Sequence, residues 1–120
     1  MPARAALFTS SYSAVDPARV VPVRTSVGVP RFAGYALEEW PSVYPWGLLD
    51  VSEEQLFRRR YRHRLHRQTP RILAELAQLL DRYDGWPLAL CCFEADPAAC
   101  HRSILARWLR EKGAAIEEAK

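Results

Sequence analysis

A short segment in the last third of the chain constrains the fold more than any other. Residues 87–93 form an apolar run of strand length, bounded by Gly85 before it and by Asp96-Pro97 after it. Both alternating faces of this run are apolar, which is typical of a central strand in a parallel sheet that is covered on both sides. Asp followed by Pro is a strong helix start, with Asp as the N-cap and Pro at the first helical position. The segment therefore predicts a strand–loop–helix unit of an α/β fold.

The rest of the chain alternates in the same way. We expect strands at 5–8, 20–24 and 115–116, a helix that starts at Ser52 with Gln55 completing a capping box, a helix from Thr69-Pro70 to Gly85, and a last helix that ends at Gly113. Short strands alternating with helices are typical of a layered α/β domain. We predict one domain over residues 1–120, with a small, mostly parallel sheet and helices packed on both of its faces.

Residues 28–50 interrupt this alternation. The segment is rich in Pro and Gly and carries several aromatic residues. A long irregular segment inside a small domain is usually functional or disordered, and the aromatic density indicates that this one packs. Two interpretations stay open: a lid or wall over a site, or a loop that only completes the core. Exposure of Trp40 and Trp46 would indicate an interface.

The predicted strand-to-helix corner gathers reactive side chains. It holds Cys91, Cys92, Glu94, Cys100, His101 and Arg102, and with them every cysteine of the chain. Cys100 lies one helical turn before Ile104 and His101 one turn before Leu105, so we expect both to point toward the sheet. They would then lie at the carboxyl end of the strand, where open α/β sheets bind ligands. A helix N-terminus also attracts anions and favours a thiolate.

The same run resembles a known family signature. An apolar strand ending in Cys-x-Glu, a short acidic-Pro loop and a Cys-His-Arg that opens the last helix are similar to the domain-of-unknown-function 488 (DUF488) family of small bacterial proteins. The residues that match are Cys92, Glu94, Cys100, His101 and Arg102. Arg24 stands in the place of the Arg that the family carries in an early strand. A Gly-His-Ser turn found in many members is replaced here by Phe8-Thr-Ser-Ser-Tyr12. The resemblance implies a fold and a candidate site, but no settled reaction.

Taken as an enzyme site, the corner gives each residue a role. Cys100 would be a thiolate nucleophile, or else the support of a catalytic Glu94, and His101 would carry a proton near neutral pH. The supporting residues would be Arg24 and Arg102, which bind an anionic group, and Cys92, which lies beside Glu94. We expect a nucleotide-like or other anionic small molecule as the substrate. The Cys-x5-Arg spacing of Cys-dependent phosphatases is missing, so we do not predict phosphatase activity.

Two other interpretations of the corner stay open. Cys92, Cys100 and His101 could ligate zinc, with Glu94 as the fourth ligand or as a base. Adjacent residues on a helix point about 100° apart, which makes joint ligation by Cys100 and His101 awkward, and there is no C-x-x-C pair. We therefore predict neither a metal nor a cofactor. The structural alternative is that the cysteines are buried small side chains and that Glu94 pairs with Arg102.

Residues 58–67 form the second notable feature, a helical run dominated by Arg. One interpretation is a nucleic-acid contact through Arg58, Arg59, Arg62 and Arg64. The other is a solvated helix face, because Glu53 and Glu54 stand near the N-terminus and the cations toward the C-terminus, as the helix dipole favours. The alternative function is therefore a non-catalytic nucleic-acid- or nucleotide-binding module that uses this helix.

Composition bounds the remaining choices. The chain has 120 residues, of which 49% are hydrophobic and 26% charged, so it is globular. It contains no apolar stretch of ~20 residues, and its N-terminus lacks the apolar run of a signal peptide, so we expect no membrane contact. Three cysteines, two of them adjacent, are a poor disulfide framework, which leads us to expect no disulfide and a cytoplasmic location.

Overall fold

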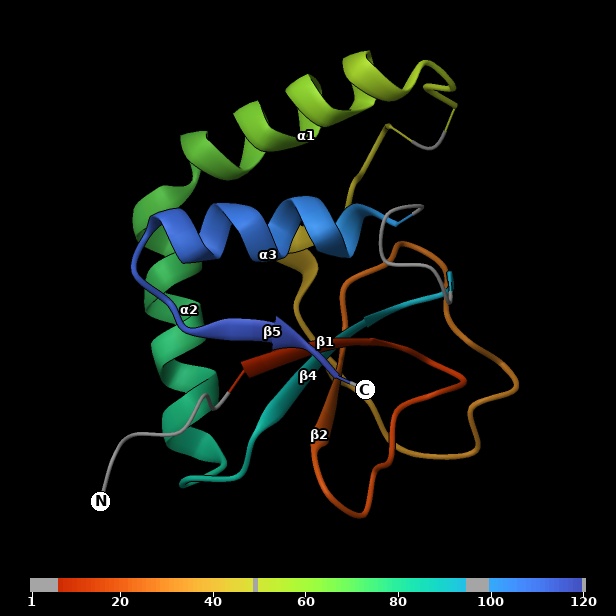
Figure 1. Cartoon of the computed structure of the whole chain (residues 1–120), viewed down its shortest axis with the longest axis vertical. Helices are drawn as coiled ribbons and strands as arrows, with labels where there is room; N and C mark the ends of the chain where they lie inside the picture. Colours follow the sequence, from red (N-terminus) through yellow and green to blue (C-terminus); the bar gives the residue numbers. More distant parts are fainter. Residues whose placement is uncertain (1–6, 49, 95–99, 120) are drawn as a thin grey trace.

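A computed structural model describes residues 7–48, 50–94 and 100–119, and its elements alternate as an α/β fold does (Figure 1). The elements are β1 (Leu7–Ser11), β2 (Val21–Arg24), β3 (Glu38–Glu39), the 3-10 helix η1 (Pro41–Val43), α1 (Glu54–Arg67), α2 (Thr69–Arg82), β4 (Leu88–Cys92), α3 (His101–Glu111) and β5 (Ile116–Glu118). The predicted α/β class is confirmed. No helix among the described residues combines the length and the apolar character needed to cross a membrane.

The sheet is parallel throughout, and its central strand is β4. The strand order is β3-β2-β4-β1-β5, with every pairing parallel. All five residues of β4 are buried, as expected for an apolar strand that is covered on both faces. Ser11 pairs with Cys92 and Arg24 with Cys91, so β1, β2 and β4 end at the same edge of the sheet.

The two faces of the sheet are covered differently, which corrects the expectation of helices on both. The main core joins β-strand residues Leu7, Val23, Leu88, Leu90 and Ile116 to buried residues of all three helices, among them Tyr61, Leu65, Ile72, Leu76, Leu105, Trp108 and Leu109. On the opposite face, Tyr12, Ala89 and Cys91 form a smaller cluster. Partly buried residues of the segments 12–20 and 35–37 cover that cluster.

Connectivity explains this one-sided arrangement. The chain passes from β3 to β4 through α1 and α2, and from β4 to β5 through α3 (Figure 1). Both steps move in the same direction along the sheet, and because crossovers are right-handed, their helices lie on the same face. The steps from β1 to β2 and from β2 to β3 run in the opposite direction and contain no helix, so loops cover the second face.

Several predicted boundaries move. β1 is Leu7–Ser11 and not 5–8, and α1 is capped by the Glu53 carboxylate, which accepts from the N–H groups of Gln55 and Leu56, and not by Ser52. The predicted start of α2 at Thr69 is confirmed, as is a short last strand. α3 begins at His101, because Cys100 has extended backbone angles (φ −128°, ψ 146°). Asp96 and Pro97, the predicted helix start, lie outside the described residues.

The 28–50 segment contributes to the core. It contains β3 and η1, and it buries Trp40, Val43 and Leu48 in the main cluster. Trp40 is therefore not the exposed interface residue that was considered from the sequence, whereas Trp46 is half exposed. The segment therefore packs into the core, as its aromatic density indicates.

Candidate functional site

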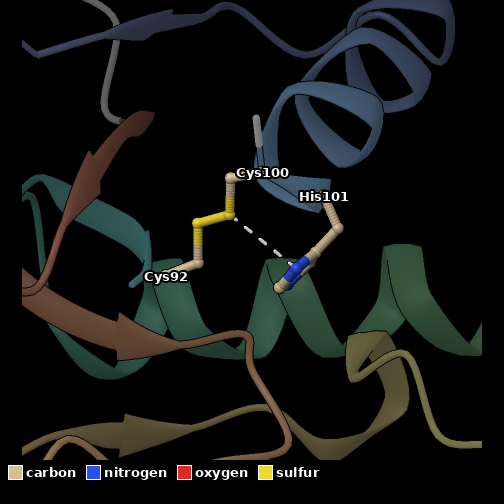
Figure 2. A group of neighbouring side chains, drawn as sticks. All are labelled: Cys92, Cys100 and His101. Atoms are coloured by element: carbon tan, nitrogen blue, oxygen red, sulfur yellow. Dashed lines mark hydrogen bonds between the residues drawn. A yellow bond between two sulfur atoms is a disulfide. The ribbon is translucent and has the colours of Figure 1, made fainter. Parts of the chain in front are cut away.

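The carboxyl end of β4 and the start of α3 bring two cysteines together. Cys92 is the last residue of β4, Cys100 is the N-cap of α3, and both are buried. Their sulfur atoms are joined in a disulfide, with the Cα atoms 6.9 Å apart (Figure 2). The expectation that these cysteines form no disulfide is therefore wrong. The odd number of cysteines did not indicate a pair. The third cysteine, Cys91, is free because its side chain points to the opposite face of the sheet.

His101 lies beside this pair and is anchored to β2's end. Its Nε2 is 2.7 Å from the backbone oxygen of Thr25, and its Nδ1 is 3.8 Å from Cys100 Sγ (Figure 2). The Tyr61 ring meets the imidazole edge-on, with centroids 5.5 Å apart. A carbonyl oxygen can only accept, so Nε2 carries the proton and Nδ1 presents its lone pair toward the sulfur.

Burial also sets the charge of His101. Desolvation lowers its pKa to about 4, and the nearby Arg102 charge acts in the same direction, against the hydrogen bond to Thr25. The imidazole is therefore neutral at neutral pH. This differs from the expectation of a proton carrier near neutral pH, and it suits a residue that orients or coordinates a neighbour.

Arg102 is fully buried and forms hydrogen bonds with the residues at the end of β4. Its Nη1 donates to Cys92 Sγ at 3.3 Å and to the backbone oxygen of Glu94. Its Nε and Nη2 donate to the Glu118 carboxylate at 3.1 and 2.7 Å, and Glu118 also accepts from the Thr9 hydroxyl. Among the described residues, Glu118 of β5 is the acidic side chain that pairs with Arg102, and Glu94 contributes its backbone oxygen.

Arg24 holds the neighbouring loop. Its guanidinium donates to the backbone oxygens of Ser26 (2.9 Å) and Val27, and to the Glu39 carboxylate at 2.7 Å. It also lies 4.6 Å over the Tyr44 ring. The donors of Arg24 are therefore directed at the loop that follows β2 and at Glu39 of β3.

A pocket of about 950 Å³ opens next to the cluster. Its lining residues include Cys92, Glu94, Cys100 and His101 from the strand-to-helix corner and Phe57 and Arg58 of α1. Residues 26–28, Pro45, Leu48 and Phe93 also line it. The volume is within the range of roughly 300–1,000 Å³ of small-molecule sites. Pro45 and Leu48 belong to the 28–50 segment, so this segment lines the pocket in addition to packing into the core.

The structure therefore brings some predicted site residues together and separates others. Cys92, Glu94, Cys100, His101 and Arg58 line one pocket. Arg24 and Arg102 are not among its lining residues, and they hold the loop and the strand end that form its walls. On α1, Arg62 pairs with Glu111, and Arg64 donates to the backbone oxygen of Trp46. Arg59 is exposed.

Sequence reasoning missed three partners of the site: Thr25, Tyr61 and Glu118. Thr25 directly follows β2, which pairs in parallel with β4. Parallel neighbours end at the same edge of a sheet, so a prediction that β2 and β4 are neighbours would have placed Thr25 near the end of β4. Tyr61 lies on the buried face of α1 and carries no sequence signal beyond that of a core residue. Glu118 carried no local signal, because its importance depends on the pairing of β5 with β1.

Comparison with known proteins agrees with the motif. The family model described as the active DUF488-N3 subclade matches residues 37–113, which is more than half of the chain. The matched region includes Cys92, Glu94, Cys100, His101 and Arg102, and it begins after Arg24. No curated protein and no solved structure matches the chain. The chain belongs to the DUF488 family, which confirms the resemblance.

Proposed function

We propose that this DUF488 protein is an enzyme that acts on a nucleotide-like or other anionic small molecule in the pocket beside Cys92, Cys100 and His101. The observation that carries the proposal is the convergence of two sulfur atoms, an imidazole and the Glu94 residue on one pocket wall. These groups come from two different elements at the carboxyl edge of a parallel sheet, where ligands bind in such folds.

The residues on the wall suit chemistry in the reduced state of the cysteine pair. Cys100 stands at the N-cap of α3, where the partial positive charge of the helix end favours a thiolate. His101 Nδ1 lies 3.8 Å from Cys100 Sγ, and its lone pair can accept from the Cys100 S–H while that residue is a thiol. Glu94 lines the same pocket and is the candidate for proton transfer to or from a substrate.

The substrate class follows from the other walls. Phe93 is 43% exposed and Phe57 faces the same space, so a flat ring can lie against aromatic side chains. Arg58 supplies a cation, and its partner Glu54 is itself exposed, so an anionic group can compete for the guanidinium. The start of α3 adds backbone N–H groups, and no described side chain caps them.

This assignment changes the roles of two arginines. Arg24 and Arg102 were expected to bind the anion, but their donors contact protein oxygens and a sulfur. We propose that they position the loop at 25–28 and the end of β4, and that Arg58 contacts the anion in their place.

Ligand binding tests the substrate class. Reduced protein would be heated with each of the four nucleoside monophosphates and with inorganic phosphate, and its melting temperature recorded. We expect at least one nucleotide to raise the melting temperature, and Arg58→Gln and Phe93→Ala to weaken that effect while Arg59→Gln does not. Equal responses of Arg58→Gln and Arg59→Gln, or no response to any of these anions, would contradict the proposed substrate class.

A second candidate function is supported by the exposed side of α1. Arg60, His63 and Arg67 follow helical spacing and are all exposed, and neither arginine forms an ion pair among the described residues. Such a face suits a nucleic-acid backbone without sequence readout. The partners of this face would be single- or double-stranded nucleic acids, and their binding would weaken steeply with salt. Fluorescence anisotropy of a labelled oligonucleotide, with Arg60→Glu/Arg67→Glu as the variant, measures it.

A further inference from the structure

Three metal-ligating side chains meet at the wall of the pocket. One ligand atom each from Cys92, Cys100 and His101 lie within 4.8 Å of one another. Two of these atoms are sulfurs and one is a ring nitrogen, which is a donor set that zinc prefers in proteins. All three residues belong to the end of β4 or the start of α3, so their backbone positions are set by regular structure.

We propose that, when the cysteine pair is reduced, Cys92 Sγ, Cys100 Sγ and His101 Nδ1 hold one zinc ion whose fourth position faces the pocket. The proposal rests on the proposed function and deepens it, because it assigns what the cluster contributes to the reaction. In this form the two sulfurs act as metal ligands, and a water molecule or the substrate would occupy the fourth position.

The local backbone removes the main objection to joint ligation. On a continuous helix, adjacent residues diverge by about 100°, which separates their side chains. Cys100 is extended and only His101 opens the helix, so the two side chains converge, with Sγ and Nδ1 3.8 Å apart. Two ligands of one tetrahedral zinc lie roughly 3.5–3.8 Å apart, given Zn–S bonds of about 2.3 Å and Zn–N bonds of about 2.0–2.1 Å.

The cysteine pair has the spacing for the same ion. The Cα atoms of Cys92 and Cys100 are 6.9 Å apart, just above the range of about 4.4–6.8 Å that disulfides usually span. Rotation of the side chains after reduction can separate the sulfurs and leave room for an ion between them. The disulfide and the metal form are therefore alternative states of one pair of residues.

The surroundings of the three residues resemble those of a metal centre. A zinc-bound histidine usually donates its other N–H to a carbonyl or carboxylate, and here Nε2 donates to the backbone oxygen of Thr25. Arg102 donates to Cys92 Sγ, an interaction that holds a thiolate ligand in place. With three protein ligands among the described residues, the site would be of the open, catalytic type.

Metal titration of the reduced protein tests the proposal. Metal-free protein, reduced with a phosphine that binds zinc weakly, would be titrated with zinc in competition with a chromophoric chelator. We expect one zinc ion per chain in wild type and in the matched control Cys91→Ser. Cys92→Ser, Cys100→Ser and His101→Asn should each bind at least about 100-fold more weakly, because even residues outside the ligand shell cost about 10–100-fold.

The disulfide form provides a control that needs no substitution. Wild type with the Cys92–Cys100 disulfide intact should lose the stoichiometric site, and reduction should restore it. Cobalt in place of zinc should give thiolate-to-metal charge-transfer absorption in the reduced protein alone. Equal affinity in the disulfide and reduced forms, or in Cys91→Ser and Cys100→Ser, would overturn the proposal, as would the lack of a stoichiometric site.

The two proposals can fail separately. Stoichiometric zinc without any turnover would support the metal site and contradict the enzyme. Turnover that is unchanged by removal of zinc from the reduced protein would support the enzyme and overturn a catalytic role for the metal.

Discussion

The Cys–His corner and the Arg-rich helix α1 are both conspicuous in the sequence, but their side chains differ in burial and in the contacts that they form. At the corner, Cys92 and Cys100 are buried, and His101 is partly buried and fixed by contacts from β2 and α1. Along α1, several arginines are exposed and others pair with exposed carboxylates or a carbonyl. The side chains of the corner are held together by tertiary contacts, whereas α1 presents mostly a solvated face.

This difference shows that side chains from separate elements that meet in space indicate a functional site better than many similar residues close together in the sequence. Residues 58–67 are contiguous, so the helix distributes their side chains around its axis, and only Arg58 reaches the pocket. The corner residues come from two elements, the end of β4 and the start of α3, and their side chains meet. The following predictions test this contrast, from the largest expected effect to the smallest.

Replacement of a buried arginine should cost far more than replacement of an exposed one. Arg102→Met removes a fully buried cation from Glu118, Cys92 and Glu94, and we expect a loss of about 3 kcal/mol in the free energy of unfolding. Arg62→Met, which breaks the exposed pair with Glu111, should cost no more than about 0.5 kcal/mol. Urea unfolding measures both. Similar losses for the two variants would erase the distinction between the regions.

The pH dependence of stability should report the burial of His101. Its pKa is about 4 in the folded protein and near 6.5 in the unfolded chain, so the unfolded chain binds more protons between these values. Stability should therefore fall as the pH drops from 6.5 to 4, by about 3 kcal/mol for this residue.

The variant His101→Asn isolates this effect. Unfolding of metal-free wild type and of His101→Asn would be compared across that pH range. The difference in free energy between the two proteins should change with pH, in the direction of a relative gain for the variant at low pH. A constant difference would contradict the burial of a neutral imidazole.

The inner face of α1 should matter although its outer face does not. The Tyr61 hydroxyl donates to the backbone oxygen of Val43 at 2.6 Å, and the ring packs on His101. Tyr61→Phe should cost about 1 kcal/mol, because it leaves a buried carbonyl without its donor. Thermal unfolding measures the loss of stability. Tyr83→Phe is the control, because it also removes a tyrosine hydroxyl, one that donates to Glu38 from a more exposed position.

The outer face should contribute least to stability. Arg59→Gln changes an exposed side chain with no ion pair among the described residues, so the free energy of unfolding should stay within about 0.5 kcal/mol of wild type. Denaturant unfolding measures it. A loss of more than 1 kcal/mol would indicate a structural role for this face that the helix geometry does not provide.

Sequence patterns located the corner because its signals are local. The apolar run of β4 and the Cys-His-Arg motif identified the strand, the last helix and four of the pocket residues. The one-sided helical cover was not predicted, because it depends on the order of strands in the sheet. The disulfide and the Glu118 partner of Arg102 also depend on tertiary contacts between segments that are separate in sequence.

Turnover of a mixed pool of small metabolites tests most directly the central claim that the Cys–His corner is an enzyme site for an anionic small molecule. Reduced wild type, Cys91→Ser, Cys100→Ser and Arg60→Glu/Arg67→Glu would be incubated with the pool, with and without one equivalent of zinc, and every metabolite followed by mass spectrometry. The account predicts that the same anionic metabolite is consumed by wild type, by Cys91→Ser and by the helix variant, and is left intact by Cys100→Ser. Consumption by Cys100→Ser, loss of turnover in the helix variant alone, or no consumption by wild type would contradict it.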